Sequence, residues 1–487
     1  MNDNGYIYLR AAQFFLDGGL DAARTVFHLP FFPIMIASVS TITGLSLENA
    51  SYLLNSLLLA VMAVAFGKIV SELTTDRRVL IAAVILLLAH PKLNDNYRAS
   101  IIRDPGYWAF YLLAILSYLR FWKRPRLQEA LGWGCAMIAA TLFRYEGVVF
   151  LLCAPFFLFL RSNTSTKNKL RQFCKLNIIP VSLVSMALIW GVTTEHRGLL
   201  DFAQLNVLTG WISNIVPNLH HILLDRADLL SDALFYDFSY SQGYALSSVV
   251  ITLLLIFLTE TASSLTYIYT PFSLHAIARR IFPRNNGISV IAGFVAINVA
   301  VLLVYLTRYL FVTGRYVIPL ILLLLVFTAF SLVHIYEHWQ IQRVVSWRWR
   351  WAGRFFIIIF LLTALDGFIS TSPSKGYIRE AGYWLHDNMP DTAKVYTNNS
   401  GILYYSGKVR EDLQKYAVTI DNIDNLLSSS INNTVVALSI KRKNRVLNQW
   451  LSNWKGTPPI KEFKNNNDDK MVIFSTMNQR LDNKVQQ

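Results

Sequence analysis

The sequence predicts a polytopic α-helical membrane protein that ends in a small α/β domain. Of its 487 residues, 54% are hydrophobic and only 15% are charged, which is too apolar for an ordinary soluble protein. In addition, apolar runs of about 16–25 residues recur along the first three quarters of the chain, and a run of this length crosses a bilayer as a helix.

This criterion gives about ten transmembrane spans. Every second connection between them carries a group of lysines or arginines, and such connections remain on the cytoplasmic side. The expected spans lie near residues 50–72, 79–91, 104–121, 128–143, 146–161, 176–194, 246–270, 287–306, 316–336 and 354–371. The basic connections lie at residues 77–78, 120–126, 161–175, 279–284 and 343–354.

The opposite, outer side then receives the two ends of the chain and several connections. Residues 1–28 have the pattern of an amphipathic interfacial helix, with Leu9, Ala12, Phe15 and Leu16 on one face. The apolar run at 30–44 is too short for a span and is interpreted as juxtamembrane or re-entrant. The remaining outer segments are the loop 92–103, the turn 144–146, the long loop 195–245 and the loop 307–315.

Residues 372–487 differ in kind, because they are polar, rich in Asn and without long apolar runs. A helical pattern at Tyr377–His386 is followed by three strand-like runs, and this alternation predicts a small outer α/β domain. The strand-like runs are Ala393–Thr397, Val435–Ile440 and Met471–Ser475, and Asn465–Asp469 and the last ten residues are expected to be mobile.

The predicted organisation is therefore a transmembrane domain, residues 1–371, and a soluble domain, residues 372–487. The first contains the outer juxtamembrane segment 1–48 and the long outer loop 195–245.

The composition excludes several function classes. The formal net charge of +15 would suggest a nucleic-acid partner in a soluble protein, but here the basic residues determine topology and no nucleic-acid-binding motif accompanies them. No P-loop, GxGxxG or GxSxG pattern indicates a nucleotide or an acyl-transfer nucleophile. The pair His220-His221 lacks further spaced ligands and is interpreted as part of an ordinary loop. No cofactor is predicted, although a divalent metal stays an open alternative.

The segment Arg103–Tyr107 stands where a polar outer loop becomes an apolar helix. Two interpretations of Asp104 are open. Asp is a favoured N-cap and Pro is favoured at the first helical position, so Asp104 and Pro105 could simply start the helix. Alternatively, Asp104 is an acid at the mouth of a membrane-embedded site.

Other polar residues on the outer side are few, and they are candidate site residues for that reason. Asp3 is a second outer acid, and two outer acids at one cavity can supply a proton acceptor. Arginines and histidines near them can neutralise a phosphate, although an outer arginine is more often an interfacial residue. The candidates for substrate binding are Arg103, Arg144, Glu146, Arg315, Tyr316 and His28.

In order along the chain, these features resemble the GT-C superfamily of integral membrane glycosyltransferases, in particular the family 39/83-like group. That group includes protein O-mannosyltransferases and the lipid A aminoarabinose transferase. Asp3 with Tyr8 resembles the family's first-loop Asp and the Tyr that follows, and Asp104 falls where these enzymes carry a second outer acid. The segments His28–Pro33, Leu142–Gly147 and Gly314–Pro319 are similar to the family's PPLYP, LTRPEG and RYLLP motifs.

The resemblance implies an inverting transfer of a hexose or pentose from a polyprenyl-phosphate-linked donor. The acceptor would be a lipid, glycan or protein at the outer face of a bacterial inner membrane, with the C-terminal domain in the periplasm. By position, Asp3 would be the general base or acceptor-positioning acid, Asp104 the second acid, and Arg144 and Arg315 ligands of the lipid phosphate. Tyr145 stands where the family usually has Pro, and a span precedes the first-loop Asp in the family.

Three alternatives remain open at this point. An O-antigen polymerase or ligase also combines many spans with a large outer loop, which residues 195–245 permit. A transporter or flippase would favour ionisable residues at mid-membrane and matched halves, neither of which the sequence displays. An inactive relative of the GT-C enzymes would act as a binding or assembly subunit.

Overall fold

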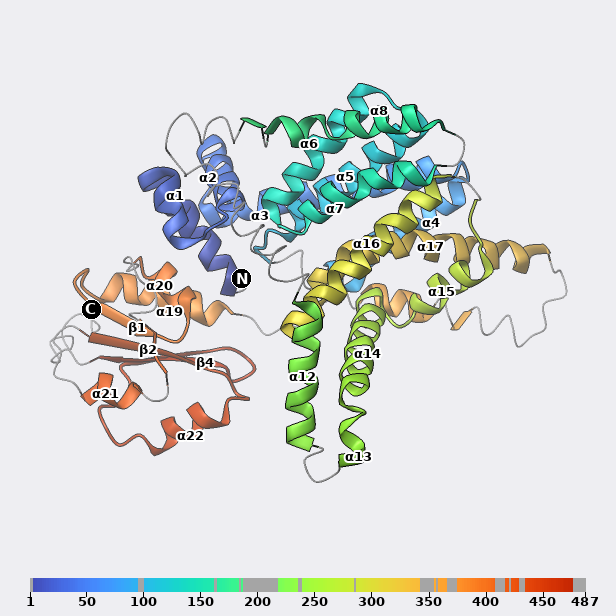
Figure 1. The fold of residues 1–487 in the computed structure, drawn as a ribbon. Coiled ribbons are helices and arrows are strands. Elements are labelled where there is room, and N and C mark those ends of the chain that lie inside the picture. Colours follow the sequence, from blue (N-terminus) through green and yellow to red (C-terminus); the bar gives the residue numbers. More distant parts are fainter. Residues whose placement is uncertain are drawn as a thin grey trace. The chain divides into compact units, whose positions relative to one another are not determined.

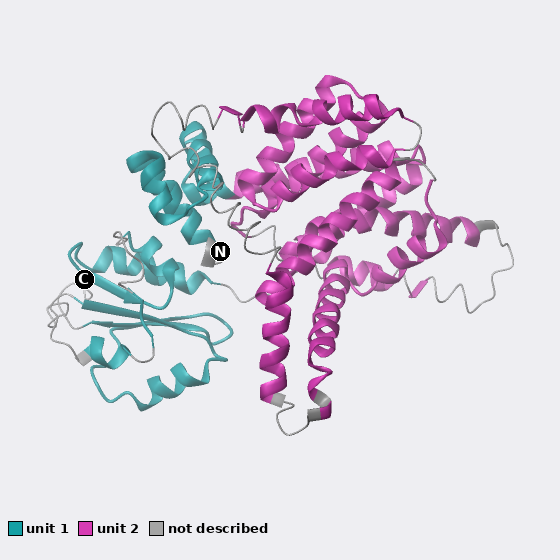
Figure 2. Cartoon of the chain, viewed as in Figure 1, with its two compact units in different colours: residues 1–51, 370–487 teal, residues 52–369 magenta. Residues whose placement is uncertain are grey.

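The computed structural model describes most of the chain and divides it into two compact units (Figure 2). Unit 1 comprises residues 1–51 and 370–487, and unit 2 comprises residues 52–369. The described residues are 3–94, 100–161, 164–183, 185–186, 218–234, 239–283, 286–341, 354–355, 358–365, 375–407, 417–419, 422–428 and 434–475.

The chain is mostly helical, and four of its described helices are long and apolar enough to cross a membrane. These are α3 (Leu47–Leu73), α14 (Ala245–Leu265), α16 (Asn286–Tyr309) and α17 (Gly314–Ile341) (Figure 1). Helix α17 is the most buried of them, with Ile321, Leu322 and Leu325 fully inside the unit. These helices indicate a membrane protein.

Shorter helices complete unit 2. Helix α5 packs along α6, and Trp108, Trp133 and Tyr118 are buried between these two helices and their neighbours. The 3-10 segment η2 extends α7 into one apolar helical stretch. The bounds are α4 Arg77–Leu88, α5 Asp104–Lys123, α6 Leu127–Phe143, α7 Gly147–Cys153, η2 Ala154–Leu160, α8 Thr166–Leu176 and α15 Thr270–Arg279.

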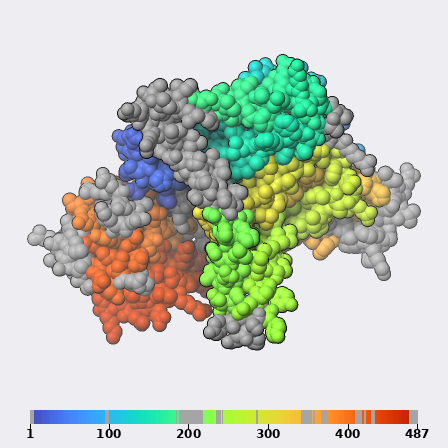
Figure 3. Space-filling view, in the orientation of Figure 1, coloured from blue at the N-terminus to red at the C-terminus, as the bar shows by residue number. Residues whose placement is uncertain are grey.

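Part of the segment 195–245, predicted as a long outer loop, is helical, and its first part, up to residue 217, lies outside the described residues. Residues Leu219–Leu234 form α12 and Ser239–Gln242 form α13, and α12 lies beside α14. In the space-filling view, the side chains of α12 and α14 fill the space between the two ribbons (Figure 3). The sequence of α12 has apolar residues at helical spacing, such as Ile222 and Leu230, but three aspartates lie between them. Because of these polar residues, the segment resembles a solvated loop. His220 and His221 fall in the first turn of α12.

Ion pairs join the ends of the helices in unit 2. Glu72, near the end of α3, accepts hydrogen bonds from Arg120 Nε at 3.1 Å and from Lys123 Nζ at 2.8 Å, both on α5. Glu260 of α14 accepts a hydrogen bond from Ser264 and lies 3.8 Å from Lys92.

The N-terminal helices of unit 1 are α1 (Asp3–Val26) and α2 (Phe31–Thr43), and they pack together. On the predicted apolar face of α1, Leu9 and Ala12 are fully buried within the unit, whereas Leu16 is 46% exposed. The difference arises because the buried half of α1 is its first half, where Tyr8 makes an edge contact with Phe32 at 5.3 Å.

The C-terminal part of unit 1 is the expected α/β domain, and it contains one more strand than expected. A four-stranded sheet has the order β1-β2-β4-β3, with β1 and β2 parallel and the other pairs antiparallel. The predicted strands are confirmed as β1 (Lys394–Thr397), β2 (Thr434–Ile440) and β4 (Lys470–Ser475), and the predicted helix as α19 (Gly376–Asn388). The other elements are α20 Ser400–Tyr405, α21 Ile423–Ser428, α22 Arg445–Asn453 and β3 Lys461–Lys464.

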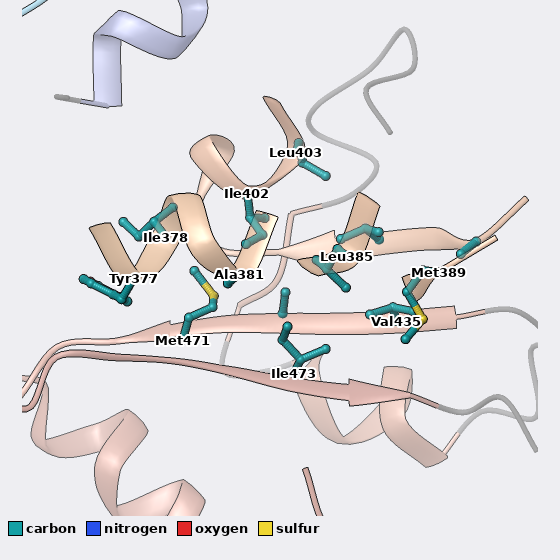
Figure 4. Close-up of a cluster of buried hydrophobic side chains, with 13 residues drawn as sticks. Tyr377, Ile378, Ala381, Leu385, Met389, Ile402, Leu403, Val435, Met471 and Ile473 are labelled. Atoms are coloured by element: carbon teal, nitrogen blue, oxygen red, sulfur yellow. The ribbon is translucent and has the colours of Figure 1, made fainter. Parts of the chain in front are cut away.

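The sheet is covered on both faces. One face packs against α19 and α20, with Leu385, Ile402 and Val435 at the centre of the cluster shown in Figure 4. The other face packs against α21 and α22 through Ile423 and Trp450 (Figure 1). Because β2 is buried along its whole length, its sequence is a continuous apolar run rather than an alternating one. Residues Asn465–Asp469, expected to be mobile, form the β3–β4 turn, where Asn465 Oδ1 accepts hydrogen bonds from two backbone amides.

Candidate functional site

Asp104 is the first residue of α5, and its carboxylate binds Arg144. The N-cap of this helix is Arg103, which makes no side-chain capping hydrogen bond. Arg144 Nη1 donates to Asp104 Oδ1, and both side chains are buried, with exposed fractions of 6% for Arg144 and 4% for Asp104. The described partner of Asp104 is therefore an arginine 40 residues further along the chain, and not the helix N-terminus.

Two glycines allow close packing around the contact of Asp104 with Arg144. At Gly106, an added Cβ would overlap the ring of Phe143, so the first turn of α5 lies directly against the last residue of α6. At Gly147, an added Cβ would lie 2.6 Å from Thr141 Oγ1, so the turn after α6 packs directly against α6. Gly106 thus lets the start of α5 approach the end of α6, next to Arg144, and Gly147 lets the turn pack against α6.

Arg144 is held from two sides by carboxylates. Besides Asp104, it binds Glu146, with Nη2 2.5 Å from Oε1 and Nε 3.3 Å from Oε2. This is the ion pair expected within the turn 144–146. Burial alone would lower the pKa of Arg144, but the charges of Glu146 and Asp104 outweigh burial and raise that pKa well above its usual value. In the same way, burial would raise the pKa of Glu146, but Arg144 outweighs burial and lowers it. The turn therefore keeps both charges at neutral pH.

Tyr316 lies between two arginines at the start of α17. The Arg144 guanidinium lies over its ring at 4.3 Å from the centroid, and the Arg315 guanidinium lies 5.1 Å from the same centroid. Arg315 also donates from Nη2 to the Tyr316 hydroxyl at 3.4 Å. A cation over an aromatic face is attracted by the ring quadrupole, so Tyr316 links α17 to the α6–α7 turn.

The cluster carries a surplus of positive charge. Arg103, Arg144 and Arg315 stand against the two carboxylates of Asp104 and Glu146, and the charge of Arg103 acts on Glu146. Among the described residues, Arg315 forms no ion pair and is half-buried. An anion such as a phosphate could therefore bind at Arg315 without displacing an existing carboxylate.

Six of the eight predicted site residues lie together in unit 2, and the other two belong to unit 1. Arg103, Asp104, Arg144, Glu146, Arg315 and Tyr316 belong to the cluster in unit 2. Asp3 opens α1 in unit 1, and its side chain lies outside the described part of the chain. His28 is exposed between α1 and α2, also in unit 1.

Two tyrosines of the cluster were missed. The ring of Tyr107 lies 5.7 Å from the Arg144 guanidinium, and the ring of Tyr305 lies 4.8 Å from that of Tyr316. Tyr107 directly follows the Arg-Asp-Pro-Gly segment and could have been noticed there. Tyr305 lies inside an apolar helix, and nothing in the sequence distinguishes it from an interfacial anchor.

No group of three or more His, Cys, Asp or Glu side chains that could hold a metal ion is present in the described ranges. The two carboxylates of the cluster are already bound to Arg144.

No protein-family model and no curated protein matches the chain. Among solved structures, the chain is similar to the crystal structure of ArnT from Cupriavidus metallidurans in the apo state. The sequences are 13% identical, the match covers 98% of this chain and 94% of that chain, and the TM-score is 0.40.

Proposed function

We propose that the protein is a membrane glycosyltransferase of GT-C type that uses a polyprenyl-phosphate-linked sugar donor. It transfers the sugar to a lipid, glycan or protein acceptor at the outer face of a bacterial inner membrane. About ten spans would hold the donor, and the C-terminal α/β domain would lie in the periplasm. The order of motifs along the sequence supports this class.

One observation carries the proposal: a buried arginine is fixed by two carboxylates beside a half-buried arginine, Arg315, that forms no salt bridge among the described residues, although the charge of Asp104 acts on it. In a leaving polyprenyl phosphate, negative charge grows on the phosphate as the bond to the sugar breaks. Cations that are already in position stabilise such a charge most effectively in a site that excludes water.

The reaction is an inverting displacement. The acceptor hydroxyl or amine attacks the anomeric carbon and forms the new bond to the sugar. The bond from that carbon to the phosphate oxygen breaks, and its electron pair leaves with the polyprenyl phosphate. The acceptor's proton passes to a carboxylate base.

In this proposal Arg315 contacts the leaving phosphate and Arg144 adds positive charge beside it. Asp104 and Glu146 are positioning residues for Arg144, since each of them binds its guanidinium. Asp3 is proposed as the base on its position in the sequence pattern.

The test is a transfer assay in isolated membranes with a panel of labelled polyprenyl-phosphate sugars and mass analysis of lipid, glycan and protein products. The wild type is compared with Asp104→Asn, which removes the charge but keeps the shape of the side chain. We expect transfer by the wild type and a loss of at least about 100-fold in the variant, because Arg144 loses one of its two fixed partners.

Asp76→Asn is the matched control. Asp76 also stands at the start of a helix in unit 2, where it accepts a hydrogen bond from the amide of Arg78 at 2.9 Å, and Asn caps a helix equally well. Transfer should be unchanged in this variant. Equal transfer by the wild type and Asp104→Asn would remove the cluster from the reaction, and a well-inserted wild-type protein without transfer would contradict the proposed function itself.

A further inference from the structure

The α/β domain contains a crevice at the point where its chain connections diverge. After β1 the chain continues into α20, which covers one face of the sheet, whereas after β2 it continues into α22, which covers the other (Figure 1). Strands β1 and β2 are parallel neighbours, so both connections leave from the same edge. In open α/β sheets, ligands bind outside the carboxyl ends of the strands at such a switch point.

A pocket of about 330 Å³ lies at this place. Its wall consists of Asn398, Asn399 and Ser400, which follow β1, and of Ser439 and Lys441 at the end of β2. A volume near the lower end of the range of small-molecule sites, about 300–1,000 Å³, fits a ligand the size of a substituted monosaccharide.

The floor of the pocket is held in place before any ligand binds. Asn398 Nδ2 donates to the Ser439 carbonyl at 2.9 Å, and the Ser439 amide donates to Asn398 Oδ1 at 2.7 Å. These two hydrogen bonds connect the ends of β1 and β2. A rigid site binds more tightly because less freedom is lost on binding.

The charge of the pocket has one sign. Lys375, just before α19, and Lys441, just after β2, both line it, and its described lining residues include no Asp or Glu. The rest of the lining is mostly amide and hydroxyl groups, which suit the hydroxyls of a sugar. A phosphate is an anion that two lysines bind well.

We infer that this pocket is a binding site for the phosphate group of a small phosphorylated saccharide, either free or as the headgroup of a lipid. Lys375 and Lys441 contact the phosphate, and Asn399 and Ser400 contact the sugar. The site lies wholly within unit 1, and it stands whether or not the helical unit transfers a sugar.

The experiment is isothermal titration of the purified full-length chain in detergent micelles with glucose 1-phosphate, with inorganic phosphate and with glucose. We expect glucose 1-phosphate to bind more tightly than glucose. Lys441→Gln and Lys375→Gln should each weaken binding about tenfold, because each removes one charge-assisted contact. Competition against glucose 1-phosphate distinguishes the two sources. Stronger competition by a short-chain phosphatidic acid than by inorganic phosphate indicates a lipid headgroup, and the reverse order indicates a free saccharide phosphate.

Lys464→Gln is the matched control, because Lys464 is an exposed lysine on β3 in the same domain and does not line the pocket. It makes the same change in net charge and should leave binding unchanged. A second variant, Ser400→Asp, adds a carboxylate to the pocket at the start of α20, a position that tolerates Asp, and should abolish phosphate binding.

Three results would overturn the inference. They are glucose binding as tightly as its phosphate, a loss in Lys464→Gln as large as in Lys441→Gln, and unchanged binding in a folded Ser400→Asp variant.

Discussion

The two basic clusters described above differ in how far their positive charges are buried. In the helical unit, Arg144 is buried at 6% exposure and is bound by two carboxylates. In the α/β domain, Lys375 and Lys441 are exposed and line a pocket whose described residues include no acid.

The difference follows from the surroundings. A charge that is fully buried inside an apolar helical bundle is costly unless it is paired, and Arg144, the most buried arginine of the cluster, is paired with two carboxylates. A lysine at the surface of a polar domain is hydrated and needs no such partner. Substitutions in the first site are therefore expected to lower the stability of the fold. Substitutions in the second site are expected to change ligand binding with little effect on stability.

The largest expected effect is on the stability of the helical unit. Arg144→Met should lower the free energy of unfolding by about 3–5 kcal/mol, because it removes the guanidinium that forms salt bridges with both Asp104 and Glu146. Lys441→Met, the same change in the other site, should cost at most about 0.5 kcal/mol. Unfolding in detergent by denaturant titration measures both values. Similar losses of stability in the two variants would contradict the expected difference between the two sites.

The pH dependence of stability tests the ion pair between Arg144 and Glu146. The pKa of Glu146 is lowered in the folded protein relative to the ordinary value of 4.5, so its ion pair stabilises the folded state fully above pH 4.5. That contribution disappears as the pH falls through the lowered pKa. The Tm of the wild type should therefore exceed that of Glu146→Gln by a constant amount between pH 5 and 8 and approach it in more acidic solution. A difference that stayed the same down to about pH 3 would contradict the ion pair.

A smaller effect is expected where α5 meets α6. Gly106→Ala should cost about 1–3 kcal/mol, because its Cβ overlaps the Phe143 ring and separates Asp104 from Arg144. Gly67→Ala is the control, since its Cβ would have Val84 as its nearest neighbour, at 3.6 Å. This control should be neutral or slightly stabilising, because Ala favours a helix. Phe143→Leu combined with Gly106→Ala should recover part of the loss, and an absence of any recovery would place the clash elsewhere.

The smallest effect lies in the α/β domain. Asn399 caps α20 by accepting a hydrogen bond from the Gly401 amide at 2.9 Å, so Asn399→Ala should cost about 1 kcal/mol. Asn399→Ser keeps an acceptor at that place and should cost less. Thermal unfolding of the full chain distinguishes the two, and equal losses would mean that the cap contributes nothing measurable.

The sequence predicts the parts of the fold whose patterns are local. The buried strand β2 and the spans of α14, α16 and α17 are continuous apolar runs, and their positions are close to those expected. Strand β3 was missed because Lys461–Lys464 is a short, mostly charged edge strand with a single partner. Helix α12 was missed because its aspartates resemble a solvated loop.

The candidate site was only partly predictable for a similar reason. The pair of Arg144 with Glu146 lies within one turn and could be expected from spacing. The contacts of Arg144 with Asp104 and with Tyr316 join segments far apart in the chain, so they depend on how α5 and α17 pack against the α6–α7 turn. The small residue Gly106 permits that packing, but its partner Phe143 is not identifiable without the fold.

The most direct test of the central claim is the affinity of the purified full-length protein for a polyprenyl phosphate, because the account assigns the surplus cation of the cluster to that group. The comparison is between wild type, Arg315→Gln and Arg279→Gln, in which Arg279 is an exposed arginine in the last turn of α15. The account predicts about tenfold weaker binding in Arg315→Gln and unchanged binding in Arg279→Gln. Equal affinity for all three proteins would contradict the assignment of the lipid phosphate to this cluster.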